Sequence, residues 1–557
     1  MFLEFPEYPL LRTILLTTLV TTSLGIAAVV IALGRRAMKH RVLLHIPGPA
    51  SPSFWAGNAL EMFDAVTGFK YRDQVRKTFG TLSRFHGPFG DQILLISDPA
   101  ALTAVLGKDR DIFEEAYWFI ELFRHAVGPG LLCSTGAHHR KQRKLLNPSF
   151  SVSRLKAMVP LLHKITNELI DSFNEKIPDG RGEVEVLDPF GRVALEMIAQ
   201  TGLGYTFESF KPEANKNEFT NSIKEFMSVV GKLQVFLPLF PLVSHWNAKF
   251  LRFIAACIPS ADLHYIIKLS DITKGGLQRL FQAKKEMLAR GDAAELMNQI
   301  SEGKDIINTL MRENAESADE YKIEDDEIKA QMHALVAAAT DTTSVSLARL
   351  AQVLAQHPEW QEKLRQELNE AVASRGEELG YDELFELPYL EAVTRETWRL
   401  YAPVTFVTRC ARSDTTLPLL RPIQGVNPPQ TSIFVPEGTN IIIDILGGNC
   451  EQSMWGPDAD EWKPERWLAP LPDSVTDAHI PGVYSNLFTF LSGSRSCIGF
   501  KQAELEIKVV LSQILRNFRF SEAKTEVVWR LGPVITPSVN TPAGIKFGLP
   551  LVMERLQ

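Results

Sequence analysis

The segment FTFLSGSRSCIGFKQAELEIKVVL, from Phe488 to Leu511, constrains the fold more than any other part of this chain. It begins as a loop of small residues that contains Cys497 and ends in a helical pattern. Apolar residues recur there at helical spacing on one face: Ile507, Val510, Leu511, Ile514, Leu515 and Phe518. Any fold of this chain must therefore place a cysteine directly ahead of a helix N-terminus.

A cysteine at this position has two explanations. Unpaired backbone N–H groups and the helix dipole favour negative charge there, so we expect a stabilised thiolate that can act as a soft metal ligand. Gly493 and Gly499 suit a sharp loop that approaches something flat or bulky, and Arg495 indicates an anionic ligand group nearby. The alternative is a small buried residue beside a helix cap, which is common for a single cysteine.

The N-terminus differs in kind from the rest of the chain. Thr13 to Leu33 is an uncharged run of 21 residues, long enough to span a bilayer as a helix. The basic residues follow this run (Arg35, Arg36, Lys39 and Arg41), whereas Glu4, Glu7 and Arg12 precede it. By the positive-inside rule, residues 1–44 are predicted to form a single-pass anchor with a stop-transfer segment, and the remainder is predicted to be cytosolic. A cleaved signal peptide is the alternative, but it would have a shorter apolar core and a basic leading segment.

The remainder of the chain is expected to form one large domain. Pro47, Gly48, Pro49 and Pro52 rule out a continuous helix over residues 45–54, which we interpret as a stiff hinge. Residues 55–557 contain no repeat and no second linker of comparable strength. Helical patterns cover 152–175, 217–232, 327–356, 359–374, 389–400 and 502–517, and the notable strand-like runs are 92–97, 431–435 and 440–446. The predicted fold class is mainly α with a minor β portion.

Charge and cysteine usage exclude several classes of protein. The net charge of -7 gives no overall nucleic-acid footprint, so no nucleic-acid partner is expected. The five cysteines are scattered, without CxxC, CxxCH or zinc-finger spacing. They therefore indicate neither a disulfide framework nor a covalently attached haem.

The helical segment from His333 to Leu350 is apolar nearly all round, which is typical of a helix buried in a core. Yet Asp341, Thr342 and Thr343 lie in its middle. A helical threonine can donate to the carbonyl four residues earlier, so a tolerated polar turn is one interpretation. A buried carboxylate is costly unless it is paired or functional, so Asp341 favours a functional interpretation.

Two further groups of charged residues stand out. Glu396 and Arg399 share a face of the predicted helix 389–400, as Glu391 and Arg395 do, although a solvated surface also explains such pairs. Arg466, in an aromatic and proline-rich loop, is expected to be a structural anchor. The segment 136–150 carries Arg140, Lys141, Arg143 and Lys144, which indicates a solvated basic face or a site for an anionic ligand and an acidic partner.

Taken in this order, these segments resemble the cytochrome P450 family, from the apolar N-terminal run to the last residues. The most specific element is Phe490-x-x-Gly493-x-Arg495-x-Cys497-x-Gly499 followed by a helix. The resemblance implies the cytochrome P450 fold with haem b, and Cys497 as its axial ligand. It also implies that Arg495 and Arg143 face the haem propionates, with His139 in place of the usual tryptophan.

The resemblance assigns roles to residues outside the cysteine loop. Glu396, Arg399 and Arg466 would form a buried structural triad. Asp341 and Thr342 would activate oxygen, on a helix with Ala339 in place of the usual glycine. The implied lining of the substrate pocket is Tyr117, Trp118, Phe119, Phe123, Val404, Phe406 and Ile535.

The implied activity is that of a fungal microsomal monooxygenase, which inserts one atom of O2 into a lipophilic substrate, with terpenoids or other secondary metabolites favoured over fatty acids. No dinucleotide fingerprint such as GxGxxG is present, so NADPH is expected to act through a cytochrome P450 reductase, with cytochrome b5 as a further donor. The reductase would dock near Arg140, Lys141, Lys144 and Lys501. The expected location is the endoplasmic reticulum membrane.

Two alternative functions stay open at this point. One is a haem-thiolate isomerase or dehydratase that acts without O2, and the other is a non-catalytic haem sensor or structural membrane protein. The placement of Leu233 to Val243 is also open: this uncharged segment, broken by two prolines, either dips into the membrane interface or forms a buried loop.

Overall fold

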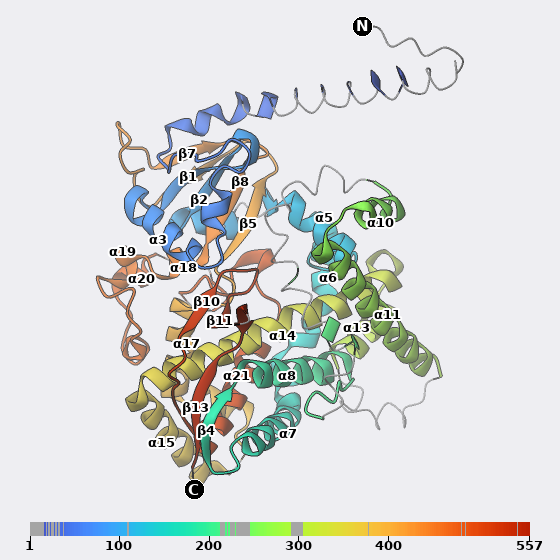
Figure 1. The fold of residues 1–557 in the computed structure, drawn as a ribbon, viewed down its shortest axis with the longest axis vertical. Helices are drawn as coiled ribbons and strands as arrows, with labels where there is room; N and C mark the ends of the chain where they lie inside the picture. Colours follow the sequence, from blue (N-terminus) through green and yellow to red (C-terminus); the bar gives the residue numbers. More distant parts are fainter. Residues whose placement is uncertain are drawn as a thin grey trace.

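The computed structural model consists of a sheet-rich lobe and a larger helical lobe (Figure 1). It describes residues 38–108, 111–211, 246–290 and 305–556 apart from a few single positions, together with scattered residues within 16–36 and 218–229. The fold is mainly α with a small β portion, which confirms the class predicted from the sequence.

Five of the six predicted helices occur within two residues of their expected bounds. They are α7 (Val152–Lys176), α14 (Asp325–Gln356), α15 (Pro358–Arg375), α17 (Pro388–Leu400) and α21 (Phe500–Asn517). Local capping explains several of these limits: α14 begins with a capping box between Glu324 and Glu327, and α15 begins at a proline and ends before Gly376. The sixth predicted helix, residues 217–232, lies mostly outside the described residues.

The other α-helices in the described part of the chain are shorter or less regular in sequence pattern. They are α2 (Ala59–Met62), α3 (Gly68–Phe79), α4 (Pro99–Thr103), α5 (Tyr117–Ala126), α6 (Gly136–Leu146), α8 (Leu187–Ile198), α10 (Ala248–Cys257), α11 (Ala261–Arg290), α13 (Ile306–Glu316), α16 (Tyr381–Phe385), α18 (Ile445–Asn449), α19 (Gln452–Trp455) and α20 (Asp473–Thr476).

The main sheet joins strands from distant parts of the chain. Its order is β1 (Leu82–His86), β2 (Gln92–Ile96), β8 (Asn440–Asp444), β5 (Phe406–Ala411) and β3 (Phe113–Glu115). β2 and β8 run parallel, with Ile93 opposite Asn440, and the other pairs are antiparallel. The predicted strand 440–446 is too long, because Ile445 already begins α18.

Strands are more numerous than the sequence patterns indicate. Three smaller sheets contain β10 (Val527–Arg530), β11 (Thr536–Thr541) and β12 (Gly544–Phe547); β4 (Arg181–Glu185), β13 (Pro550–Arg555) and β9 (Phe518–Glu522); and β6 (Thr415–Pro418) with β7 (Ser432–Val435). Most are four to six residues long, too short for alternation to stand out from chance. The predicted segments 92–97 and 431–435 correspond to β2 and β7.

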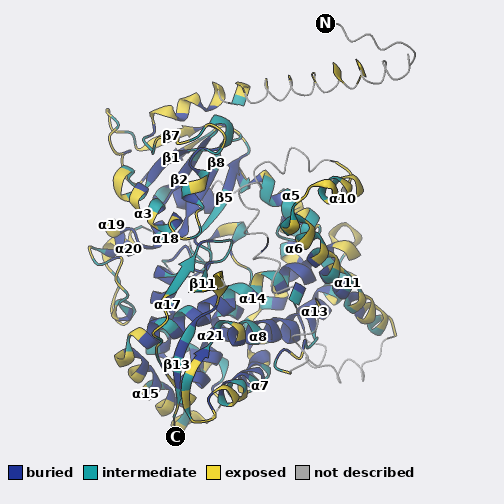
Figure 2. Cartoon of the chain, viewed as in Figure 1, coloured by how far each residue is buried: buried dark blue, intermediate teal, exposed yellow. Residues whose placement is uncertain are grey.

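One continuous apolar core joins the two lobes. It includes Leu94 on β2, Leu347 on α14 and Leu511 on α21. α14 crosses the helical lobe and packs against α8 and α21 (Figure 1), and these three helices are largely buried (Figure 2). The haem ligand predicted from the sequence therefore precedes one of the most buried helices of the protein.

The segment after the predicted anchor is attached to the sheet lobe. Arg36 donates to both carboxylate oxygens of Asp91 (2.9 and 2.8 Å), and Lys39 Nζ lies 3.0 Å from Asp414. Residues 46–53 contain no helix, as their prolines predict, and Arg84 of β1 donates to the Pro47 carbonyl. Among the described residues no helix is both long and apolar enough to cross a membrane, and most of residues 13–33 lie outside them.

Candidate haem-thiolate site

The cysteine loop is shaped by backbone contacts. A 3₁₀ turn (Gly493–Arg495) precedes Cys497, and α21 begins three residues after it, at Phe500. The Cys497 N–H donates to the Phe490 carbonyl at 2.9 Å and closes the loop. Gly493 has φ +68°, and a Cβ there would lie 2.1 Å from the Leu106 carbonyl oxygen, so only glycine fits.

The Cys497 side chain has an accessible surface, but it lies deep among the surrounding protein atoms. Burial raises its pKa, and the Gly499 N–H and Arg143 only partly oppose this effect. The thiolate predicted from the sequence is therefore not favoured by these protein groups alone, because desolvation outweighs the Gly499 N–H and the Arg143 charge. An iron ion on the sulfur would supply the missing positive charge.

α14 is open at one point of its buried length. Ala338 is exposed in the middle of this helix, with Asp341 and Thr342 half-buried next to it. Ala339 of α14 and Ile498, which follows Cys497, pack against the same apolar cluster. The open stretch of α14 and the cysteine loop therefore border the same region, and their small residues and soft ligand fit a haem.

Asp341 and Thr342 differ in how they are satisfied. Thr342 Oγ1 donates to the Ala338 carbonyl at 2.7 Å, the bond to the fourth preceding residue that the sequence allows. The Asp341 side chain has no hydrogen-bond or ion-pair partner among the described residues, and burial raises its pKa to about 7. Its carboxyl group can therefore gain or lose a proton near neutral pH.

A second carboxyl group, which sequence analysis missed, lies next to this stretch of α14 and has only neutral partners among the described residues. Thr343 Oγ1 donates to Glu506 of α21 at 3.4 Å, and Gln502 Nε2 donates to it at 2.8 Å. Burial raises the pKa of Glu506 to about 7, and within the described chain no cation offsets this. In sequence Glu506 sits on the polar side of an amphipathic pattern, so nothing marked it as buried.

Positive charge gathers beside the cysteine loop. Arg143 donates to the carbonyls of Ser494 (2.8 Å) and Ser496 (2.7 Å), and Arg495 pairs with Glu114 at 2.5 Å. The pKa of His139 is lowered to about 3, mainly by burial and further by the charges of Arg495 and Arg143. Its imidazole is therefore neutral at pH 7. The predicted residues 139, 143 and 495 are thus brought together.

Arg409 of β5 joins this group and was missed from the sequence. It is 1% exposed, donates to Glu115 at 2.7 Å, and its Nη2 has no partner among the described residues. A buried guanidinium nitrogen without an acceptor fits an anionic group such as a haem propionate. The only sequence signal was an arginine inside the strand pattern FVTRCA.

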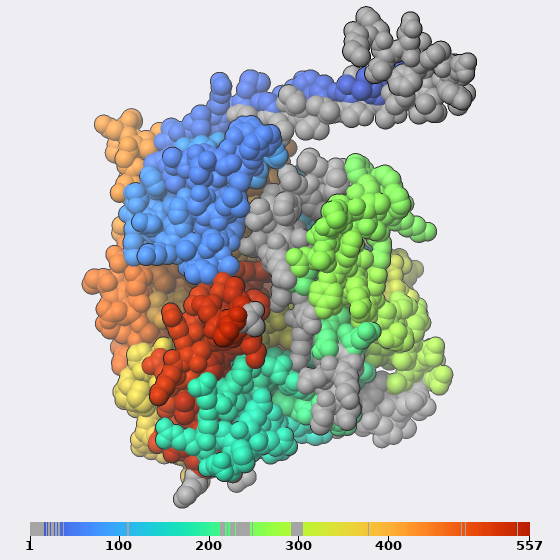
Figure 3. All heavy atoms as spheres, in the orientation of Figure 1, coloured from blue at the N-terminus to red at the C-terminus, as the bar shows by residue number. Residues whose placement is uncertain are grey.

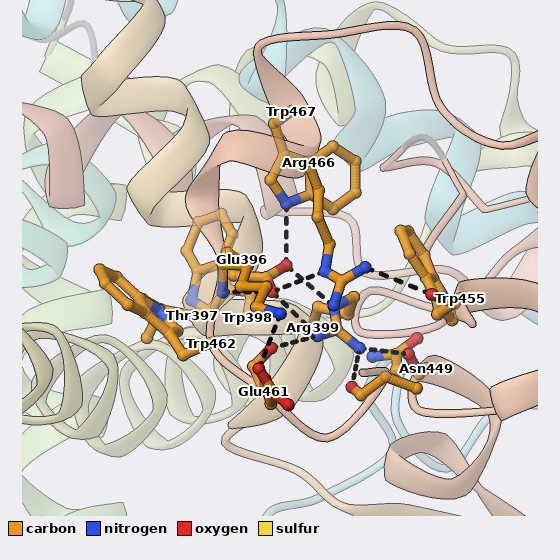
Figure 4. A network of polar contacts seen from close by, with 12 residues as sticks. Glu396, Thr397, Trp398, Arg399, Asn449, Trp455, Glu461, Trp462, Arg466 and Trp467 are labelled. Atoms are coloured by element: carbon orange, nitrogen blue, oxygen red, sulfur yellow. Dashed lines mark hydrogen bonds and ion pairs between the residues drawn. The ribbon is translucent and has the colours of Figure 1, made fainter. Parts of the chain in front are cut away.

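Glu396 and Arg399 are fully buried at the centre of a polar network (Figure 4), so the solvated-surface alternative is wrong for this pair. Arg399 donates to both carboxylate oxygens of Glu396 (2.8 and 2.9 Å), and both side chains are 0% exposed. Arg466 Nε lies 3.4 Å from the same carboxylate, and Trp467 Nε1 donates to it at 3.0 Å. Arg399 also donates to the carbonyls of Ala459 and Glu461, so the network holds residues 449–467 against α17.

The predicted pocket residues fall into three groups. Phe119 and Phe123 of α5 pack against Ala334 of α14, in the same helix as Asp341. The segments of Val404, Phe406 and Ile535 are joined, because the Ile535 N–H donates to the Pro403 carbonyl at 2.9 Å. Tyr117 is 55% exposed beneath Arg412, and Trp118 packs with Leu269 of α11. A separate cavity of about 500 Å³, between Arg76 and Arg421, is lined by none of these residues.

A cysteine loop ahead of a buried helix, a clustered set of cations and an opened core helix are the features expected of a haem-thiolate protein. The Cytochrome P450 family profile matches residues 47–541. Cytochrome P450 monooxygenase 91 of Postia placenta is 40% identical over 524 residues, which cover 94% of this chain and 96% of that protein. Ganoderic acid synthetase of Ganoderma lucidum is 35% identical over 514 residues, or 90% and 93% of the two chains. This chain therefore belongs to the cytochrome P450 family and is a P450 monooxygenase, for which the family implies a haem-thiolate cofactor.

Proposed function

We propose that this chain is anchored in the endoplasmic reticulum membrane by residues 13–33 and oxidises a lipophilic secondary metabolite, with terpenoids favoured. In this proposal one atom of O2 enters the substrate, and electrons come from NADPH through a cytochrome P450 reductase. The observation that carries the oxygen-dependent reaction is the pair Asp341 and Thr342 on the open stretch of α14.

The residues of this pair have complementary roles in proton delivery. When bound, haem supplies the oxidising chemistry, and its thiolate ligand favours O–O bond cleavage. Thr342 Oγ1 gives its hydrogen to the Ala338 carbonyl, so its lone pairs are left to accept a proton donor such as water. Asp341, with a pKa of about 7, can resupply that proton near neutral pH.

Lipophilic lining and one relative support the substrate class. Phe119, Phe123, Val404 and Ile535 present mainly apolar surface beside α14 and β5. The similar protein from Ganoderma lucidum is named for ganoderic acid, which supports a secondary metabolite over a housekeeping lipid.

Exposed aromatic residues support contact with a membrane. Three aromatic side chains are exposed at α10: Trp246, just before the helix (44%), and Phe250 and Phe253 within it (51% and 65%). Trp55 of the sheet lobe is 72% exposed. α10 lies in the same half of the molecule as residues 38–45, which follow the predicted anchor (Figures 1 and 3). Aromatic side chains favour the membrane interface. The other segment considered, Leu233 to Val243, lies outside the described residues.

The basic face of α6 supports a site for an acidic electron donor. Lys144 is exposed, and with Lys141 it borders a cavity of about 570 Å³ shared with Glu313 and Tyr321. Arg140 is exposed and, within the described part of the chain, pairs only with the exposed Asp111, an interaction that a partner's carboxylates could replace.

The test is turnover in membranes that contain the protein and a P450 reductase, with ¹⁸O2 as the gas. We expect a product that carries one ¹⁸O atom and forms only when NADPH and reductase are both present. Thr342→Ala should retain the carbon-monoxide absorption band of the reduced protein but release peroxide, with product formation lowered roughly 10²-fold. Product formation without O2 and NADPH would instead establish an isomerase or dehydratase.

A further inference from the structure

Arg72 of α3 is buried with most of its hydrogen-bonding capacity unused. Its side chain is 3% exposed, and Nη2 donates to Thr405 Oγ1 at 3.1 Å. Nε and Nη1 are buried and have no partner among the described residues. Arg399, also buried, donates through all three of its side-chain nitrogens. Arg72 is therefore an exception that needs a physical explanation.

Among the described residues, no carboxylate contacts the Arg72 guanidinium either. Asp444 acts on it only through space, and burial lowers the pKa of the guanidinium. The rings of Phe406 and Phe69 lie 5.0 and 5.7 Å from its central carbon and give partial compensation. A buried charge with so little compensation destabilises the ligand-free protein.

The position of Arg72 connects it to the candidate substrate pocket. Thr405 and Phe406, its two neighbours, follow Val404 in the predicted pocket lining. The second pocket segment lies beside the same helix, because the Leu531 N–H donates to the carbonyl of Ala65, just before α3, at 2.7 Å. Arg72 thus lies directly beside the Thr405 and Phe406 segment of the candidate pocket lining.

We propose that Arg72 binds a carboxylate on the lipophilic substrate. A carboxylate would satisfy the free N–H groups and neutralise the guanidinium, whereas a neutral acceptor such as a hydroxyl would do only the first. The substrate is therefore an amphipathic acid, held with its charged end at α3 and its apolar body toward α14. This inference rests on the lipophilic pocket of the proposed function.

Equilibrium dialysis of the haem-loaded full-length protein in detergent tests this assignment, with dehydroabietic acid and its methyl ester as a matched pair of probes. The wild-type protein should bind the acid more tightly than the ester. Arg72→Met should weaken binding of the acid by about 10- to 100-fold and leave binding of the ester unchanged. Arg76→Gln is the control, because Arg76 lies one turn further along α3 and already pairs with Asp73. It should keep the preference for the acid.

A stability measurement separates recognition from a structural role. Arg72→Met should melt at the same temperature as the ligand-free wild type or higher, because it removes a poorly compensated buried charge. Arg72→Lys, which keeps the charge with fewer donors, should retain part of the acid preference. A lower melting temperature in Arg72→Met with equal loss of acid and ester would assign Arg72 to the scaffold and overturn the proposal.

Failure of the inference is distinct from failure of the proposed function. If the wild type binds acid and ester equally, Arg72 does not read a carboxylate, although the lipophilic pocket stands. If it binds neither probe, the lipophilic pocket and the inference that rests on it are both contradicted.

Discussion

Charged side chains in the interior are handled in opposite ways around α17 and beside α14. Around α17, Glu396 meets Arg399 and Arg466 directly, and despite burial the hydrogen bonds and charge of Glu396 raise the pKa of Arg399. Beside α14, Asp341 has no partner within the described chain, and Glu506 has only the neutral Thr343 and Gln502. The Arg399 guanidinium therefore stays charged, whereas the carboxyl groups of Asp341 and Glu506 exchange protons near pH 7.

This difference separates residues that fix the backbone from residues that can transfer protons. A fully satisfied ion pair has no proton to give and no freedom to move, so it can only fix the backbone of residues 449–467. A lone buried carboxyl group is costly for stability but useful for proton transfer. The four predictions that follow break or sharpen this contrast, from the largest expected effect to the smallest.

Arg399→Leu should be the most damaging change. It leaves the Glu396 carboxylate buried with only the more distant Arg466 as counter-charge, and the expected loss is about 3–5 kcal/mol of unfolding free energy. Urea unfolding measures this loss. The control is Arg375→Leu, because Arg375 and Glu386 form an exposed pair that should contribute less than about 1 kcal/mol. Equal losses in the two variants would show that burial of the network is unimportant.

Glu506→Gln should change the pH dependence of stability. The folded pKa of Glu506, about 7, lies above its unfolded value of 4.5, so the folded state holds a proton that the unfolded state has lost. Wild-type stability should therefore fall by about 3 kcal/mol from Glu506 alone as pH rises from about 4.5 to about 7. Glu506→Gln should lack this contribution and be the more stable protein at pH 8. If stability falls equally with pH in the two proteins, the raised pKa of Glu506 is contradicted.

Asp341→Asn should slow oxygen-dependent turnover by roughly 10²-fold at pH 7. The wild-type rate should fall as pH rises above about 7, because the Asp341 carboxyl group then loses its proton. The variant should show no such change, and an organic peroxide should restore much of its activity. Steady-state rates between pH 6 and 8.5 test this, and an unchanged pH profile in the variant would contradict the role.

Thr343→Val should have the smallest effect. The change removes a hydrogen bond of 3.4 Å to Glu506, so the expected loss is about 0.5–1.5 kcal/mol of unfolding free energy. Product formed per NADPH should stay near the wild-type value, in contrast to Thr342→Ala one position earlier. A strong fall in coupling would place Thr343, and through it Glu506, in the proton path.

Helix positions and the ligand loop could be predicted from the sequence, because periodicity and a dense local motif carry them. Asp341 and Thr342 stood out as polar residues in an apolar helix. Other residues could not be found this way, since burial and missing partners are tertiary properties. Arg72, Arg409 and Glu506 each lie in segments with an ordinary mix of charges, and only the packing of distant elements buries them. Among the described residues this packing leaves Arg72 and Glu506 without a contacting counter-ion and Arg409 Nη2 without an acceptor.

The burial of Glu396 could not be read from spacing either. Pairs three residues apart are common on exposed helices, and the exposed pair Lys322–Asp319 has the same spacing. What distinguishes Glu396 is the return of residues 461–467 over α17, which brings Trp467 and the Lys463 N–H to its carboxylate. The strands were underestimated for a similar reason, since partners such as β2 and β8 are remote in sequence.

The parallel pairing of β2 with β8 also has a consequence for biosynthesis. Residues 93–96 pair with residues 440–443, which leave the ribosome about 350 residues later. At about 5–20 residues per second, the apolar edge of β2 waits roughly 20–70 s for its partner. During that interval the β1–β2 hairpin is an open template for other strands. The centre of the main sheet is thus among the last parts of the nascent enzyme to become safe from aggregation.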